Sequence, residues 1–337
     1  MKNLSLFALL FMTMFLLNAQ ENIDELLAAG VKDAKTFTTY YIAPSSEGLA
    51  FGINNGWFNK ATTSKRFKLE FSILANGSFI KDEKKSFTMN VSDYENIRFS
   101  DNSPSKTVAT SLGHNDPDVS VFVTYNDPIF GEQEVEVTLP TGIGATNISL
   151  IPTAYLQASF SPFKGTEIKG RFFPKVNIED ANIGLYGVGI QQEFTRWLPA
   201  EKVFPVAVSG VVAYTRLNGS YDFTDTGIVD GENQQIETIV NTMLYQLVVG
   251  TKLKMINFYG GLGYVSGKST TNLLGTYRVS NGVVFADEIV DPFSIKQDVK
   301  GVRTSLGANL KLGFFALNAD YTFAEFDSAS LGINFSF

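Results

Sequence analysis

The sequence has no cysteine, a single histidine and a formal net charge of −7. Without cysteine the chain cannot form a disulfide bond, use a thiolate nucleophile or carry a lipid on a cysteine. One histidine without cysteine cannot supply the ligands of a usual zinc site. An acidic chain with no basic cluster lacks the charge that nucleic acids require. We therefore expect no metal, no cofactor and no nucleic-acid partner.

Beyond its first 20 residues the sequence also lacks any apolar run approaching the ~18 residues that a membrane helix needs. The one long apolar run, residues 4–17, follows Lys2 and is followed by the small residue Ala19. This arrangement is typical of a secretory signal peptide, and the run is short for a membrane anchor. We predict cleavage after Ala19.

The C-terminus carries the clearest structural pattern. Leu331, Ile333, Phe335 and Phe337 alternate with small or polar residues, so their side chains share one face of a strand. A barrel in the outer membrane pairs its last strand with its first and presents apolar side chains to lipid. We predict an all-β fold, a transmembrane antiparallel β-barrel in the cell outer membrane. The alternative fold is a soluble β-sandwich, which would show the same alternation with its apolar side chains in the core and its polar ones in water.

Strand patterns recur from residue 64 onward. The clearest candidates are 65–80, 86–99, 148–160, 166–175, 183–196, 204–218, 242–254, 256–266, 299–312, 315–324 and 328–337. Residues 100–147 are interrupted by prolines and show no clear register. Short turns alternate with longer connections, above all 219–241 and 267–298, as periplasmic turns alternate with outer loops in bacterial barrels. The pattern predicts 12 to 14 strands, with the C-terminus at the periplasmic side.

Residues 20–62 differ from the remainder of the chain. A helix is expected after Asn22, and a glycine-rich stretch containing Asn55, Gly56 and Trp57 follows it. The segment is either a small periplasmic helix or a plug inside the barrel lumen, and we favour the plug. The predicted organisation is a signal peptide (1–19), an N-terminal helix and plug-like segment (20–62), and the barrel (63–337).

Little in the chain could support catalysis. A serine hydrolase would have to use His114, the only histidine, which lies in a proline- and aspartate-rich connection. A solvated loop residue is the simpler interpretation. We expect no catalytic residue and no enzyme activity.

Charged residues that alternate with apolar ones are the best candidates for the lumen. Glu167, Lys169 and Arg171 would project from one strand, with Gln191 and Glu193 facing them from the next. The same alternation adds Lys252, Lys254, Arg303 and Asp320. These residues either line a constriction that selects solutes, or form a structural network that docks the N-terminal segment. We favour the second alternative.

Several short motifs carry a resemblance to a known family. They are Pro44, the Asn55-Gly56-Trp57 segment and the stretches 150–157, 165–167, 171–174 and 187–194. They resemble an uncharacterised family of secreted Bacteroidetes proteins, a domain of unknown function presumed to form outer-membrane barrels. The resemblance implies the fold and location and assigns no catalytic residue. The barrel with its plug is more loosely similar to long-chain fatty-acid transporters, although the chain lacks the early Asn-Pro-Ala pattern of that family.

These observations predict a passive outer-membrane channel or transporter for small solutes, hydrophobic ones included. The alternative is a non-conducting structural or adhesive barrel that acts through loops 219–241 and 267–298. The expected partners are outer-membrane lipid, a small-molecule solute and the barrel assembly machinery, which would bind the last strand through Phe337.

Overall fold

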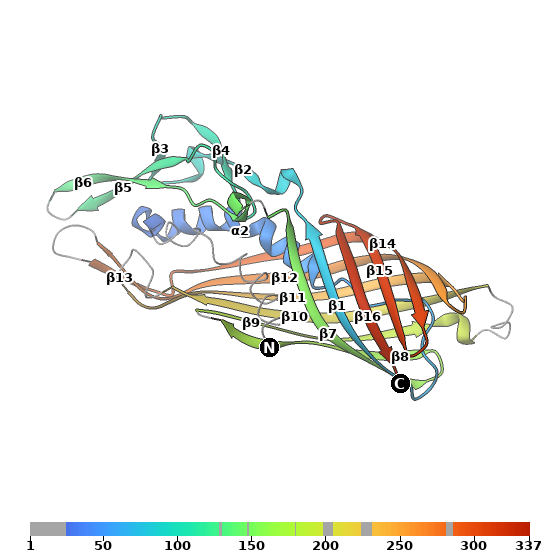
Figure 1. Ribbon diagram of the computed structural model, residues 1–337. Helices are drawn as coiled ribbons and strands as arrows, with labels where there is room; N and C mark the ends of the chain where they lie inside the picture. Colours follow the sequence, from blue (N-terminus) through green and yellow to red (C-terminus); the bar gives the residue numbers. More distant parts are fainter. Residues whose placement is uncertain are drawn as a thin grey trace.

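Ten strands form a closed antiparallel barrel within the part of the chain that the computed structural model describes (Figure 1). That part comprises residues 25–127, 130–146, 148–178, 180–197, 205–223, 231–280 and 286–337. The closed barrel confirms the predicted fold class. The predicted signal peptide lies outside the described residues.

Each barrel strand pairs with its neighbours along the chain, and the first strand closes the barrel by pairing with the last. The barrel strands are β1 (Leu69–Phe79), β7 (Leu150–Phe163), β8 (Thr166–Ile178), β9 (Ala181–Glu193), β10 (Val206–Asp222), β11 (Gly231–Thr251), β12 (Ile256–Ser280), β14 (Phe293–Leu312), β15 (Phe315–Phe323) and β16 (Ser328–Ser336). In the closing pair, Ile73 lies opposite Ile333 and Phe71 opposite Phe335.

The predicted count of 12 to 14 strands was wrong because residues 80–149 do not join the barrel. They form a cap, defined here as these residues, which contains two small sheets. One sheet pairs β2 (Ser86–Asn90) with β4 (Ser105–Ala109), and the other contains β3 (Ile97–Phe99), β5 (Ser120–Asp127) and β6 (Gly131–Thr138). These strands are short and β6 is charged on one face, so they offer no apolar surface to lipid.

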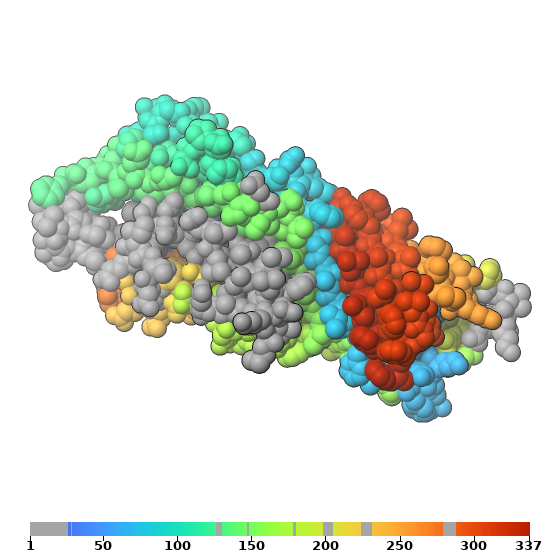
Figure 2. Space-filling model, in the orientation of Figure 1, coloured from blue at the N-terminus to red at the C-terminus, as the bar shows by residue number. Residues whose placement is uncertain are grey.

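An apolar belt encircles the outside of the barrel. On β12 the exposed side chains include Ile256, Phe258, Leu262 and Tyr264 in alternation, and the other barrel strands repeat the pattern. Figure 2 shows β15 and β16, in red, forming a continuous face beside β1, with the cap at the upper left. A surface with this much exposed apolar area is expected in lipid and not in water.

The two ends of the barrel differ. At the turn end, short turns such as 164–165 and 313–314 connect the strands, and the C-terminal Phe337 lies there. At the cap end, β11, β12 and β14 extend well beyond the apolar belt, and β13 (Ala286–Val290) pairs with the end of β12. The predicted loops 219–241 and 267–298 are therefore mostly strand where the structure describes them, and their residues 224–230 and 281–285 lie outside the described part. Their outward residues turn polar above the belt, which removes the alternation that marks a lipid-facing strand.

One long helix enters the barrel from the cap end. η1 (Glu25–Ala29) and α2 (Val31–Gly52) run from beneath the cap into the lumen, where the chain continues toward the turn end before β1 begins. The remaining helical turns are η2 (Asp82–Lys84), η3 (Val91–Asp93), η4 (Ile143–Thr146) and η5 (Phe194–Trp197). Among the described residues no helix has the length and apolarity to cross a membrane.

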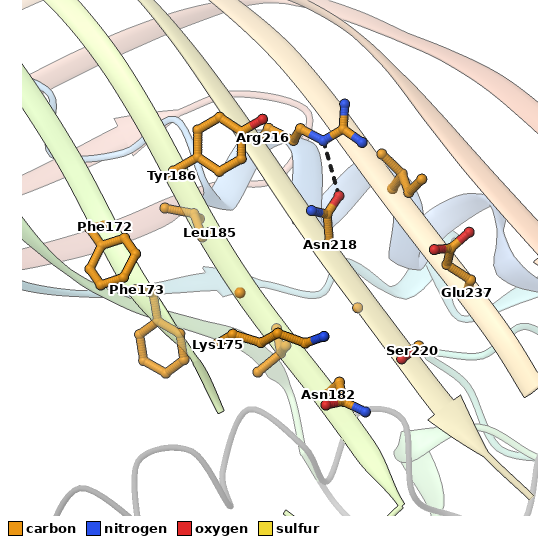
Figure 3. Close-up of a pocket in the computed structure, with 14 residues that line it drawn as sticks. Phe172, Phe173, Lys175, Asn182, Leu185, Tyr186, Arg216, Asn218, Ser220 and Glu237 are labelled. Carbon is orange, nitrogen blue, oxygen red and sulfur yellow. Dashed lines mark hydrogen bonds between the residues drawn. The ribbon is translucent and has the colours of Figure 1, made fainter. Parts of the chain in front are cut away.

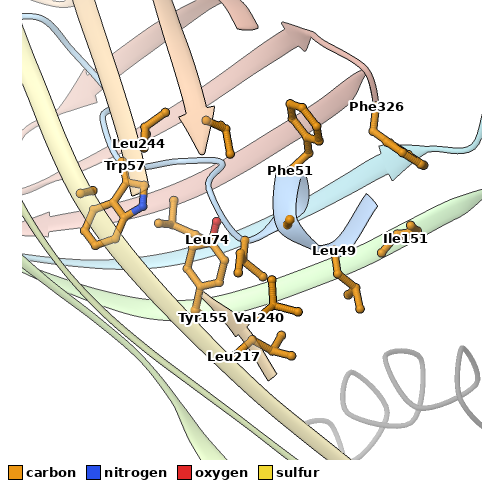
Figure 4. Close-up of a cluster of buried hydrophobic side chains, with 14 of the residues drawn as sticks. Leu49, Phe51, Trp57, Leu74, Ile151, Tyr155, Leu217, Val240, Leu244 and Phe326 are labelled. Carbon is orange, nitrogen blue, oxygen red and sulfur yellow. The ribbon is translucent and has the colours of Figure 1, made fainter. Parts of the chain in front are cut away.

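Two apolar cores surround this helix. The first runs along the lumen, where Leu49 and Phe51 of α2, and Trp57 in the segment that follows it, pack with wall residues that include Leu217 and Val240 (Figure 4). The second joins the start of α2 to the cap and to the extended strands. There burial raises the pKa of the Tyr41 hydroxyl well above its ordinary value, so Tyr41 remains a neutral donor to the Thr141 carbonyl at 2.9 Å. The cap end is thus closed by packed side chains.

Candidate functional site

The turn-end half of the lumen is occupied by residues 53–64, which we call the plug. Trp57 at its centre is completely buried. Its indole lies against Gly187 and Gly189 of β9, where an added Cβ would come within 3.0 and 2.9 Å of the ring. Gly56 adopts a φ of 70°, which only glycine accepts without strain, and this turn directs Trp57 toward β9.

Arg171 of β8 is the principal contact between the wall and the plug. Its guanidinium lies between two aromatic rings, 4.0 Å from the centroid of Trp57 and 3.8 Å from that of Tyr155. It donates hydrogen bonds to the carbonyls of Ile53 at 2.6 Å and Asn55 at 2.8 Å. A planar cation with several donors suits this combination of stacking and bidentate contact.

Neighbouring side chains continue the pattern toward the turn end. Lys169 donates to the carbonyl of Trp57 at 2.9 Å, and Gln191 donates to the carbonyl of Lys60 at 2.9 Å. The plug has no regular secondary structure, so its backbone carbonyls need partners from elsewhere. Three side chains that alternation directs inward from β8 and β9 supply them.

Carboxylates bind the end of the plug. Glu193 accepts hydrogen bonds from the backbone nitrogen of Thr63 at 2.7 Å and from its hydroxyl at 3.0 Å. Glu70 of β1 pairs with Lys60 at 2.9 Å and accepts from Asn59. Glu167, also buried, lies 3.9 Å from Lys169. Each carboxylate is buried, and each faces a donor of the plug or a cation.

The opposite wall contributes a second arginine. Arg303 of β14 donates to the side-chain oxygen of Asn55 at 2.6 Å and to Thr322 at 3.2 Å. Asp320 of β15 is buried and accepts a hydrogen bond from Tyr259 at 3.2 Å. Asn55 is therefore held from both sides of the barrel.

Some polar atoms around the plug have no hydrogen-bond partner among the described residues. They include Nε and Nη1 of Arg303, Nε of Arg171, Nε1 of Trp57 and Nδ2 of Asn55. A buried polar atom without a partner costs about 1–3 kcal/mol in a dry interior. The contact between plug and wall therefore combines the apolar packing of Ile53, Trp57, Phe58 and Ala61 with a polar network that is incompletely satisfied.

Two of the predicted lumen residues lie elsewhere. Lys252 and Lys254 occupy the turn between β11 and β12, because β11 ends at Thr251. His114 lies exposed in the cap, with its Nδ1 3.0 Å from the Thr141 hydroxyl. Among the described residues there is no group of three or more acidic, histidine or cysteine side chains that could hold a metal ion.

Sequence reasoning missed several residues that contact the plug, notably Glu70, Tyr155 and Asn59. Glu70 could have been found, because it precedes the alternating apolar residues Phe71 and Ile73 and so faces inward. Tyr155 and Asn59 carried no such signal. Their role depends on which segment lies opposite them in the folded barrel.

Two neighbouring strands of the barrel wall, β7 and β8, are paired over only part of their length. β7 and β8 pair from the turn end as far as Leu156 and Phe172. Beyond this pair β7 continues beside β1, whereas β8 continues beside β9. In Figure 1, β7 turns upward with β1 while β9 and β10 continue to the left. We call the gap between residues 150–155 and 173–178 the seam.

Prolines on both sides explain why the seam stays open. Pro152 and Pro174 face the gap from β7 and β8, and neither has an N–H group for a ladder hydrogen bond. A register shift between Phe173 and Val176 also bends β8 against β9. Behind the seam is a small cavity of about 10 Å³ with mostly apolar lining, formed by Thr153, Ala154, Tyr155, Phe173, Ile183, Leu185 and Leu217.

Comparison with solved structures finds bacterial outer-membrane proteins at low identity. The translocator domain of the autotransporter NalP from Neisseria meningitidis matches with 10% identity and a TM-score of 0.29, over 91% of this chain and 98% of that one. Ail, the attachment invasion locus protein of Yersinia pestis, matches with 8% identity and a TM-score of 0.24, over 81% and 100%. The outer-membrane transporter YddB from Escherichia coli matches with 9% identity and a TM-score of 0.28, over 77% and 39%.

No curated protein matches this chain. A family model matches the whole sequence, residues 1–337, and its description is a family of unknown function, DUF6588. The predicted resemblance to an uncharacterised family is confirmed to this extent, while the Bacteroidetes source and the likeness to fatty-acid transporters stay predictions. The chain belongs to the DUF6588 family.

Proposed function

We propose that the protein is an outer-membrane transporter for small apolar solutes, which reach the lumen through the seam between β7 and β8. The turn end, with Phe337, would face the periplasm and the cap the exterior. One observation carries this proposal: the wall separates where an apolar cavity lies directly behind it. A barrel with a purely structural role has no need of a gap in its wall.

The position of the seam suits a solute that arrives from lipid. Leu156 and Phe172, which form the last closed pair, are 53% and 55% exposed on the outer surface. Phe79, opposite Leu150, continues the belt along the β7 side of the gap. An apolar molecule in the membrane would therefore meet apolar side chains at the gap.

The axial path is closed at both ends in this conformation. The cap and α2 close one end with packed side chains, and the plug closes the other. Onward passage to the periplasm requires the plug to move. Beside the apolar packing of Ile53, Trp57 and Phe58, many of its contacts are hydrogen bonds and charge contacts, which water can replace at a small net cost. This favours a plug that can rearrange over one that occupies the lumen permanently.

The seam can be tested by closing it chemically. Continuing the register places Ala154 opposite Pro174 across the gap, and Ala158 lies opposite Gly170 in the closed ladder. Because the chain has no cysteine, each pair can be replaced by two cysteines and bridged with a short bismaleimide. Cells that carry the protein in their outer membrane are then given radiolabelled naphthalene.

Bridging residues 154 and 174 should lower naphthalene uptake severalfold toward that of cells without the protein, while bridging 158 and 170 should leave it unchanged. Equal uptake with and without the 154–174 bridge would rule out the seam as the path. Uptake that does not depend on the protein would rule out the transport function itself.

The plug can be tested in the same assay. A Cβ at Gly250 of β11 would lie 3.0 Å from the Cβ of Ala61, so a disulfide, whose Cβ atoms are ~3.8 Å apart, needs the two positions to move slightly apart. The variant Ala61→Cys/Gly250→Cys should take up naphthalene when reduced and lose uptake when oxidised. The single variant Ala61→Cys is the control. Full uptake by the oxidised double variant would show that the plug does not gate the path.

A further inference from the structure

A groove on the outer surface of β8 to β11 lies beside the seam (Figure 3). Its volume is about 340 Å³. Phe172 and Tyr186 form its apolar end, where they belong to the belt. Beyond them, toward the cap end, Lys175, Asn182, Arg216, Asn218, Ser220 and Glu237 form its polar end. The groove therefore joins the edge of the belt to a polar surface.

The groove owes its depth to local backbone features. The shift of register between β8 and β9 bends β8 at Lys175, and Gly184 opposite it has no side chain to fill the space. A Cβ at Gly184 would lie 3.5 Å from the Cα of Lys175. A bulge bends a strand and redirects the side chain at the bend, and here that side chain is a lysine.

The polar end carries an excess of positive charge. Arg216 donates through Nε to the side-chain oxygen of Asn218 at 3.1 Å, which orients the guanidinium and leaves its two terminal nitrogens available (Figure 3). In the described part of the chain neither Arg216 nor Lys175 forms an ion pair. The one acid of the groove, Glu237, already accepts a hydrogen bond from Asn272 at 3.1 Å.

We propose that this groove binds the phosphate head group of a membrane lipid of the outer leaflet, with the lipid chains lying on Phe172 and Tyr186. Arginine binds phosphate with two parallel hydrogen bonds, and a neighbouring lysine adds a mobile positive charge. Basic residues immediately beyond an apolar belt are the usual position for lipid head groups. This proposal goes beyond transport, since a bound lipid would brace the wall where β7 and β8 are not paired.

The test uses the whole protein, purified in detergent micelles, and native mass spectrometry to count retained ligands. Three probes separate the head group from the chains: phosphatidylglycerol, a diacylglycerol with the same chains, and glycerol phosphate without chains. One phosphatidylglycerol should be retained, and the other two probes should be released. Equal retention of the diacylglycerol would show that the groove binds lipid chains and not the head group. Equal retention of glycerol phosphate would show that it binds free anions. Either result would overturn the proposal.

The variant Lys175→Gln/Arg216→Gln should weaken phosphatidylglycerol binding by roughly thirtyfold, because each basic residue near the interface contributes roughly a factor of five. The matched control is Lys296→Gln/Lys300→Gln, which removes two exposed lysines of β14 outside the groove. Heat-modifiable migration on a gel verifies that both variants are folded. Equal binding by the two double variants would overturn the proposal. The outcome does not depend on naphthalene uptake, so either proposal can fail alone.

Discussion

The two halves of the barrel interior are filled in different ways. In the cap-end half, α2 packs through Leu49 and Phe51 in an apolar core. In the turn-end half, Trp57 belongs to the same apolar core, and Arg171 and Lys169 in addition bind the backbone of an irregular plug. Apolar packing is lost abruptly when surfaces separate, whereas hydrogen bonds can be exchanged for bonds to water. The comparison indicates that one half anchors the segment and the other half allows it to rearrange.

The largest effect is expected from replacing Arg171, the main polar contact between the wall and the plug. Arg171→Met leaves the carbonyls of Ile53 and Asn55 buried without their donor and removes the stacking on Trp57, at a cost of about 3 kcal/mol. The plug should loosen while the cap end stays closed, so the amides of residues 53–64 should exchange hydrogen for deuterium faster than in the unmodified protein.

The control for this variant is Arg66→Met, at an exposed arginine whose Nε donates to the Pro162 carbonyl. It should leave this exchange unchanged. Unchanged exchange with Arg171→Met would show that this residue does not hold the plug in place.

A smaller and different effect is expected in the apolar half. Leu217→Ala removes a side chain that is 1% exposed and should lower the free energy of unfolding by about 2.5 kcal/mol. Urea titration in micelles would measure the loss. The plug keeps its polar contacts, so its amides are not expected to exchange faster, and exchange as fast as in Arg171→Met would erase the distinction between the two halves.

A third substitution overpacks the polar half without removing a charge. Gly189→Ala would place a Cβ 2.9 Å from the Trp57 ring and 3.0 Å from the Cβ of Ala213, for a loss of about 1.5 kcal/mol. Gly170→Ala on β8 is the matched control, since nothing lies within 4 Å of its added Cβ. Urea titration should give a lower free energy of unfolding for Gly189→Ala than for Gly170→Ala. Equal values would mean that Trp57 is loosely packed.

The smallest effect is expected outside both halves, in the cap. A hydrogen bond from Lys106 lowers the pKa of Asp101 to about 2. The lowered pKa means that the contact stabilises the cap above the ordinary aspartate pKa near 4 and loses its effect as the pH falls toward 2. Asp101→Asn should therefore leave protease resistance of the cap unchanged at pH 2 and reduce it slightly at pH 7. A larger loss at pH 2 would contradict this linkage.

The barrel strands were predictable because lipid imposes a strict pattern on them. The last strand, predicted at 328–337, is observed at Ser328–Ser336, and 166–175 corresponds to β8. The cap was not predictable by the same means, since β2 to β6 are short and have no lipid-facing side. The outer parts of β11, β12 and β14 were mistaken for loops because their outward residues become polar above the belt.

The sequence predicts which way the site's side chains point but not which groups they contact. Alternation indicates that Glu167, Lys169 and Arg171 project from one face of a strand, and all three are buried inside the barrel. That Arg171 binds the Ile53 carbonyl depends on a contact between residues more than a hundred positions apart, which no local pattern encodes. Lys252 and Lys254 fit the alternation equally well, but the strand ends just before them.

The course of the chain through the barrel restricts how it can open. Residues 25–42 pack beneath the cap, and residues 65–68 lead directly into β1 at the other end. The segment between them is thus attached at both mouths of the barrel. It cannot leave the lumen as a hinged domain would, so any opening must come from a rearrangement of this segment within the lumen.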